Sequence, residues 1–334
     1  MISKSELTGL ITFSENDGIV KMTIPSLKQI GIKEKNIKAS NMQQDEACFE
    51  GWAVILRATG TKKVVLGVDN AIDYKRINIF KESVFKNPHY GRFLYRALRF
   101  SEQYRDWFEL DETLNAAVQD FKYMLSKSKF TNNIPSRNCS ENTENTHPEI
   151  NTEKRFASDK KSELWGLAGL KSQGNIYRQL PVGLFQGTVA RGNGIFSGGG
   201  SAIDLWTIDN DTFCVFELKA KNEMVGAITE VFFYSNLAYD IFIGSKDKSS
   251  PFKLNRNDEN KKIFRGYDEL LNKSKDLKYI QGFLLLDEGK GGSVHTLFKD
   301  KEFLKVLNDI NKSDSRGGKI KYDMITYDYD KINK

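Results

Sequence analysis

The sequence predicts a mixed α/β fold (α+β overall), in which the second half of the chain forms a sheet flanked by helices. Residues 213–216 and 279–286 are short apolar runs of the kind that form buried strands. Around them the pattern predicts a helix, three strands, a second helix and a further strand (αβββαβ), which indicates a mixed sheet covered by helices. Strand-like and helical patterns also occur in the first half, where we expect a small α+β domain.

Two hairpins and two helices are expected in the first half. The turn signal Asn16-Asp17-Gly18 lies inside a segment of alternating polarity. Farther along, apolar residues recur at helical spacing. The predicted elements are a hairpin at 7–24, a second hairpin at 49–56 and 64–68, and helices at 89–101 and 111–125.

Composition changes between residues 126 and 160. This stretch is rich in Ser, Asn, Thr, Lys and Glu and has few apolar residues, so it lacks the surface that a packed segment must bury. We therefore expect an α+β accessory domain over 1–125, for target recognition or partner binding. A flexible linker over 126–160 and a sheet domain over 161–334 follow it.

The predicted sheet domain takes its elements from the chain in a simple order. Apolar runs bounded by Gly, Asn and Asp mark the strands, and helical periodicity marks the helices. In order, we expect a helix at 162–171, strands at 176–185, around Asp204 and at 213–219, a helix at 226–242 and a strand at 279–286. A last helix near 303–310 and a strand at 320–327 extend the sheet.

Composition also limits the classes of partner. The net charge of +6 permits an anionic partner. The three cysteines and three histidines lie far apart, which excludes a disulfide framework and any recognisable zinc motif. The chain shows neither a signal peptide nor an apolar run of membrane-spanning length, so we expect a cytoplasmic protein with no membrane partner.

Three charged residues stand at the ends of predicted buried strands. Glu217 and Lys219 are two residues apart and project from the same strand face, and a hairpin would bring Asp204 beside them. Such charges are costly to bury unless something pairs with them. Two carboxylates and an ammonium at one sheet edge predict a metal site, with a structural ion-pair cluster as the alternative.

This pattern resembles the PD-(D/E)XK (restriction endonuclease-like) nuclease superfamily, in which an Asp in one strand is followed by (D/E)-x-K in the next. Asp204 and Glu217-Leu218-Lys219 match these positions, and Ile203 replaces the usual proline. The order of elements from residue 162 onward is also similar to the core of that superfamily. The resemblance covers roughly the second half of the chain.

The resemblance implies a role for each of these residues. Asp204, Glu217 and the Leu218 carbonyl would bind Mg²⁺, a hard cation that prefers oxygen ligands, with Mn²⁺ as a substitute. The metal would lower the pKa of a bound water and neutralise charge on the scissile phosphate. Lys219 would orient that water and stabilise the oxyanion of the transition state, and the products would carry a 5′-phosphate.

Flanking helices carry three more candidates. Some resolvase-like and exonuclease-like members of the superfamily have a metal-binding Glu where Glu163 lies, although an acid there is also favoured by the helix dipole. Glu230 and Tyr234 are four residues apart and share a helix face. They resemble the Gln-x-x-x-Tyr signature of RecB-like members, with Glu in place of Gln. Alternatively, Tyr234 only packs against Phe232 and Phe233.

A basic stripe is expected on the helix at 89–101. Arg92, Arg96 and Arg99 recur at helical spacing, which predicts guanidinium groups that contact nucleic-acid phosphates. The alternative is a solvated basic face paired with Glu102 and Asp106.

The function expected from these observations is that of a Mg²⁺-dependent nuclease, a hydrolase that cleaves DNA phosphodiester bonds in restriction-like defence against foreign DNA. A catalytically inactive nuclease-fold protein that binds DNA or serves as a scaffold is one alternative, and an RNA-cleaving enzyme of the same fold is another. DNA is the expected partner. A protein partner for the N-terminal domain, a homo-oligomer, and endonuclease or exonuclease action all stay open.

Overall fold

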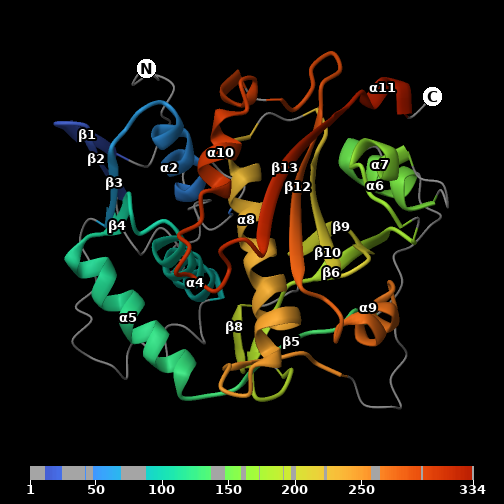
Figure 1. Cartoon of the computed structure of the whole chain (residues 1–334), viewed down its shortest axis with the longest axis horizontal. Coiled ribbons are helices and arrows are strands. Elements are labelled where there is room, and N and C mark those ends of the chain that lie inside the picture. The colour runs from blue at the N-terminus through green and yellow to red at the C-terminus, as the bar shows by residue number, and fades with distance from the viewer. Residues whose placement is uncertain are drawn as a thin grey trace.

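A five-stranded sheet in the second half of the chain, with the order β13-β12-β10-β9-β6, organises the structure (Figure 1). Its first three strands along the chain run antiparallel to their neighbours, and its last three are parallel. They are β6 (Tyr177–Pro181), β9 (Ala202–Asp209), β10 (Thr212–Lys219), β12 (Tyr279–Asp287) and β13 (Ile320–Tyr327). The mixed α/β class predicted from the sequence is therefore confirmed.

The computed structural model describes residues 12–24, 42, 48–68, 88–136, 147–158, 163–172, 174–190, 192–196, 201–221, 224–256, 264–294 and 296–332. The start of the first predicted hairpin, residues 7–11, lies outside them. Among the described helices none is long and apolar enough to cross a membrane.

Helices cover both faces of the sheet, and the side chains of β10 alternate between them as a strand requires. Phe213 and Val215 join the larger core, which contains α8 (Gly226–Ala238). Cys214, Phe216 and Leu218 join a smaller core on the opposite face. That second face is covered by α6 (Pro148–Ser158) and α7 (Glu163–Leu167), which lie on the far side of the sheet from α8 (Figure 1).

The first half forms a four-stranded sheet with the order β1-β2-β3-β4. The predicted first hairpin is present in the described residues, with Asp17 and Gly18 at positive φ in its turn. The strands are β1 (Thr12–Asn16), β2 (Ile19–Ile24), β3 (Lys63–Val68) and β4 (Phe108–Leu110). The helices are α2 (Phe49–Ala58), α4 (Pro88–Gln103) and α5 (Glu112–Ser126), and the last two confirm the predicted helices.

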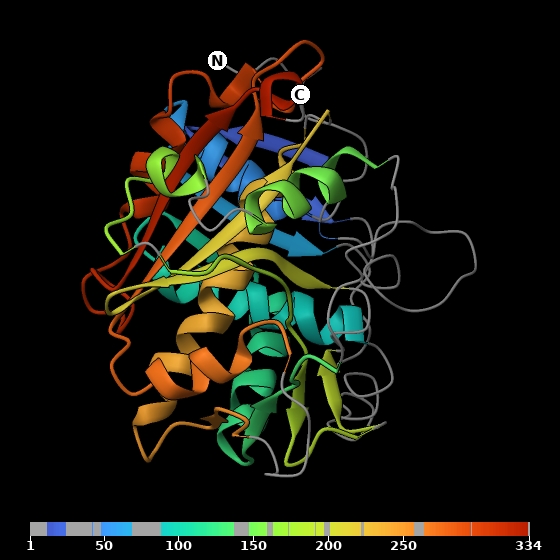
Figure 2. The ribbon, with the colours of Figure 1, turned by 90° about the vertical axis from the view of Figure 1, so that its right-hand side faces the viewer.

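A third, smaller sheet joins distant parts of the chain in the order β11-β5-β7-β8. Figure 2 shows its strands at the opposite end of the molecule from the tips of β12 and β13. They are β11 (Phe252–Lys253), β5 (Phe130–Asn132), β7 (Leu184–Gln186) and β8 (Gly194–Phe196). The remaining elements are η1 (Tyr239–Ile243), η2 (Gly244–Lys246), α9 (Tyr267–Lys273), η3 (Thr296–Phe298), α10 (Glu302–Asn308) and α11 (Tyr329–Ile332).

The prediction of a second hairpin beginning at residue 49 is wrong, because residues 49–58 form helix α2. Its residues from Phe49 to Leu56 are all buried, since α2 packs against β3, α8 and α10. A segment that is apolar on every side shows no clear period, so a buried helix and a buried strand look alike in the sequence.

The linker predicted at 126–160 contains two elements of the fold. β5 pairs with β7 and β11, and α6 packs beneath the main sheet. Each is anchored by one aromatic side chain, Phe130 and Phe156, which are 0% and 2% exposed. A single large residue per element is enough to hold a segment whose average composition is polar.

The two halves share one hydrophobic core. Val20 and Leu66 of the first half belong to the same cluster of buried side chains as Phe213 and Leu284 of the second. Helix α8 lies between the halves and contacts α2 on one side and β10 and β12 on the other (Figure 1). Residues 1–125 and 161–334 were predicted as separate domains, but their described parts pack as one body.

Candidate functional site

Asp204, Glu217 and Lys219 meet at the open end of the β9–β10 hairpin. In the antiparallel register Leu205 lies opposite Phe216, so the next residues outward are Asp204 and Glu217. The backbone N–H of Leu218 donates a hydrogen bond of 3.0 Å to Asp204 Oδ2. The juxtaposition expected from the two strand patterns is therefore present in the structure.

Lys219 is the centre of this group. Its Nζ pairs with Glu217 Oε1 and lies 2.8 Å from Glu230 Oε2, which comes from the first half of α8. The side chain of Lys219 is only 2% exposed. Tyr234, one turn after Glu230, is also buried on α8, so the structure brings both predicted helix residues to the same site.

The carboxylates of this cluster repel one another. Burial raises the pKa of Glu217 well above its ordinary value, and the nearby Asp204 and Glu230 raise it further. Burial raises the pKa of Asp204 well above its ordinary value, and the nearby Glu153 raises it further. The positive charge of Lys219 lowers this pKa but offsets only part of the increase. For Lys219, burial lowers the pKa, but Glu217, Glu230 and Asp204 outweigh it and raise the pKa well above the ordinary value. The ammonium therefore stays charged.

Glu153 of α6 is a fourth carboxylate at the site, and the sequence analysis missed it. It accepts hydrogen bonds from Arg178 and Gln179 of β6 and interacts with Asp204. Residues 148–158 were assigned to a linker, although Pro148 at the first helical position is a recognised start signal. Gln179 adopts a positive φ of 56°, a strained conformation for a residue with a side chain.

Glu163 is not part of the cluster. It is exposed at the first residue of α7, whereas the four carboxylates described above lie against β9, β10 and α8. The metal-binding role considered for an acid on the helix before the sheet therefore fits Glu153 better than Glu163.

The chemistry of this cluster fits a hard divalent cation. Its donors are carboxylate oxygens, and Glu217 Oε2 is buried without a hydrogen-bond donor among the described residues. Four carboxylates, Asp204, Glu153, Glu217 and Glu230, gather here. Lys219 pairs with Glu217 and Glu230, Arg178 pairs with Glu153, and the buried Arg92 adds positive charge near Glu230. Within the part of the chain that the structure covers, no three acidic, His or Cys side chains already surround one point.

Hydroxyl groups fix the backbone at the end of β10. Ser293 Oγ and Tyr327 Oη both donate to the carbonyl of Lys219, at 2.6 and 3.0 Å. Ser293 Oγ in turn accepts from the backbone N–H of Asp287 at 2.7 Å. These bonds join β10 to the ends of β12 and β13 and hold Lys219 in place.

The predicted basic stripe is not exposed, because Arg92, Arg96 and Arg99 are 7%, 3% and 9% exposed. Arg96 forms a two-pronged ion pair with Glu50 of α2. Arg92 donates to the hydroxyl of Ser201 at 2.7 Å, and burial lowers its pKa to about 10. The expectation of a surface that meets phosphates is wrong for this stripe, since the helix face that carries it packs inside the molecule.

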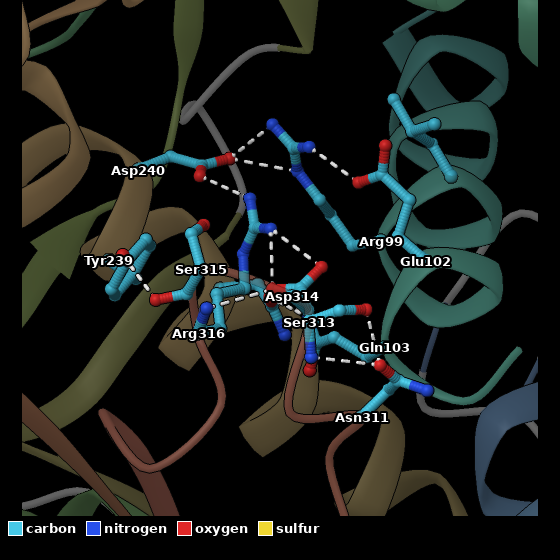
Figure 3. A network of polar contacts seen from close by, with 12 residues as sticks. Arg99, Glu102, Gln103, Tyr239, Asp240, Asn311, Ser313, Asp314, Ser315 and Arg316 are labelled. Atoms are coloured by element: carbon cyan, nitrogen blue, oxygen red, sulfur yellow. Dashed lines mark hydrogen bonds and ion pairs between the residues drawn. The ribbon is translucent and has the colours of Figure 1, made fainter.

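Arg99 belongs to a second charged network, far from Lys219. Arg99 and Arg316 converge on the carboxylate of Asp240, at 2.7 and 2.6 Å (Figure 3). This network borders an open groove of about 1160 Å³. Five basic and five acidic side chains line the groove, so it has no surplus charge for a polyanion. Asp240, in η1, follows Glu230 of α8 by ten positions, a rise of about 15 Å along the helix axis, and none of the site residues lines the groove.

A smaller hollow, of about 350 Å³, reaches Lys219 directly. It lies between the start of α6 and the end of β10. Its lining comprises His147, Pro148, Glu149, Lys219, Ala220, Lys221 and Met224. The candidate site therefore has a route to its lysine.

No protein-family model, curated protein or solved structure matches this chain.

Proposed function

We propose that this protein is a metal-dependent nuclease of PD-(D/E)XK type that hydrolyses DNA phosphodiester bonds. The observation that carries the proposal is the buried ammonium of Lys219 between Glu217 and Glu230, with Asp204 on the adjoining strand. Strongly shifted pKa values, such as those of the buried Asp204, Glu217 and Lys219, are typical of catalytic sites. The order of α7, β6, β9, β10, α8 and β12 along the chain also supports it.

Asp204, Glu217 and the Leu218 carbonyl would hold Mg²⁺, with Glu153 as a further candidate ligand. When bound, the ion lowers the pKa of water and offsets negative charge on the phosphate. Lys219 donates hydrogen bonds to the attacking oxygen and to the developing oxyanion. Because the site is buried and its dielectric constant is low, these hydrogen bonds are stronger than in water. Glu230 holds the ammonium in this position.

One observation favours the alternative of a nuclease-fold protein without activity. The ion pairs of Lys219 and its burial also suit a cluster that only stabilises the fold.

Restriction-like defence is the biological setting that we propose, by analogy with the superfamily.

The test is to incubate the purified protein with linear, circular and single-stranded DNA and with RNA, each with Mg²⁺ or with EDTA. We expect the protein to cleave DNA in the reactions that contain Mg²⁺ but not in those that contain EDTA, and to leave 5′-phosphate ends. Preferential cleavage of RNA would show that the substrate is RNA and not DNA, while the proposed metal-dependent hydrolysis would still hold. Intact substrates in every reaction, or cleavage that persists in EDTA, would contradict the proposal.

A further inference from the structure

The hollow beside Lys219 contains a side chain that the proposed reaction does not yet use. His147 is exposed at the start of α6, where its carbonyl accepts a hydrogen bond from Asn151 N–H. Of the three histidines, it is the one whose side chain the structure describes. His147 and Lys219 line the same hollow, His147 just before α6 and Lys219 at the end of β10.

Two other charged residues, Lys221 and Glu149, also line this hollow. Lys221 Nζ lies 3.3 Å from Asp330 of α11 and 3.5 Å from Asp287 of β12, and it donates to the Lys290 carbonyl. Glu149 of α6 raises the pKa of Lys219. Lys221 is held by carboxylates that raise its pKa, and Glu149 is a carboxylate directed at the Lys219 ammonium, so neither is placed to give a proton to a leaving atom.

Phosphodiester hydrolysis needs such a proton. The oxygen of water bonds to phosphorus, the bond from phosphorus to O3′ breaks, and O3′ leaves with an electron pair. An alkoxide is a poor leaving group, so a proton delivered to it accelerates the reaction by about 10²–10⁴-fold. Imidazole is the side chain that most readily holds and releases a proton near pH 7.

We propose that His147 is the general acid of this nuclease and that the hollow between α6 and β10 receives the leaving 3′-oxygen. This inference rests on the proposed function. The phosphate meets Lys219 on the β10 wall, and the leaving nucleoside faces α6. The imidazolium gives its proton to O3′, and the proton released by the attacking water passes to solvent, so atoms and charges balance. Helix α6 and the residue before it, first assigned to a linker, then supply Glu153 and the acid.

The test compares two substrates that differ only in the leaving atom. Ordinary DNA leaves through oxygen, whereas DNA with a bridging 3′-sulfur leaves as a thiolate and needs no proton. His147→Ala and His147→Gln should both slow cleavage of ordinary DNA by about 10²-fold or more. Both variants should cleave the sulfur substrate at close to the wild-type rate. Arg155→Ala changes an exposed residue of α6 that does not line the hollow, so it is the matched control and should affect neither substrate.

Two results would overturn the role of His147 while leaving the nuclease intact. One is a variant that cleaves ordinary DNA as fast as the wild type. The other is an equal loss on both substrates, which would make His147 a binding or structural residue. The melting temperatures of the variants separate that last case from misfolding. If the wild-type protein cleaves neither substrate, the proposed function fails and the role of His147 fails with it.

Discussion

Lys219 balances a set of charges that would otherwise be too costly to bury. Removing an ion from water costs several kcal/mol even after the protein relaxes. The carboxylates near Lys219 are buried despite this cost. One oxygen of Glu217, Oε2, receives no hydrogen bond within the described structure. A fold that needed only stability would do as well with apolar residues here, since buried ion pairs are often replaceable without loss. The retained charges are what a catalytic metal site requires.

The same charges predict how pH and metal change stability. The pKa values of Asp204 and Glu217 are raised in the folded chain. The stability that their protonation contributes is complete below the ordinary carboxyl pKa of about 4 and is lost as the pH rises through the folded values. Without metal, the melting temperature should therefore fall as the pH is raised from about 5 to about 8.

The proposed Mg²⁺ site predicts that the ion reverses this loss, because a ligand of the ionised carboxylates stabilises the folded protein. We expect the increase in melting temperature on replacing EDTA by Mg²⁺ to be larger at about pH 8 than at about pH 5. Calorimetry with Asp204→Asn as control, which should lose the Mg²⁺ effect, checks this. An equal increase at both pH values would show that the ion binds elsewhere.

The secondary-structure elements that local sequence patterns predicted correctly depend on residues close together in the chain. The helix beginning at Asp111 is present, with the Asp111 carboxylate accepting from Leu114 N–H. β10 and α8 are also where the apolar pattern places them. The cap of α5 and the apolar runs of β10 and α8 are local features, each contained within a short stretch of sequence.

What failed depends on residues far apart in the chain. Arg99 and Asp240 are separated by 141 positions, so the sequence around Arg99 indicates a charged surface and not a buried pair. Glu153 was missed because α6 takes its place from a single aromatic anchor, Phe156, and from partners on β6. Composition averaged over a window hides such an anchor.

The ion pair between α2 and α4 provides a test at this scale. Glu50 is fully buried and receives Arg96 together with the hydroxyl of Thr229 on α8. Arg96→Met leaves the carboxylate without its cation, so the free energy of unfolding should fall by about 3–5 kcal/mol. Urea denaturation measures it.

Two further variants complete that measurement. Glu50→Gln combined with Arg96→Met should recover part of the loss, because the uncompensated charge is gone. Lys305→Met breaks an exposed pair with Glu302 and should cost less than about 1 kcal/mol. Similar losses for Arg96→Met and Lys305→Met would mean that the buried pair contributes no more than a surface one.

For the whole molecule, the shared core predicts cooperative unfolding. Trp52 and Trp107 lie in the first half and Trp165 and Trp206 in the second, and all four are buried. Replacing one pair by Phe leaves fluorescence that reports on the other half. The two melting curves should coincide, as expected of one cooperative unit. Midpoints that differ by more than about 10 °C would indicate two domains that unfold separately.

We propose above that the cluster around Lys219 cleaves phosphodiester bonds. The most direct measurement is the single-turnover rate of DNA cleavage with Mg²⁺ for Lys219→Ala and for Lys221→Ala, two positions away in the same hollow. We expect a loss of about 10²–10³-fold or more for Lys219→Ala, a comparable loss for the isosteric Asp204→Asn, and little change for Lys221→Ala. Cleavage by folded Lys219→Ala at the wild-type rate would contradict it.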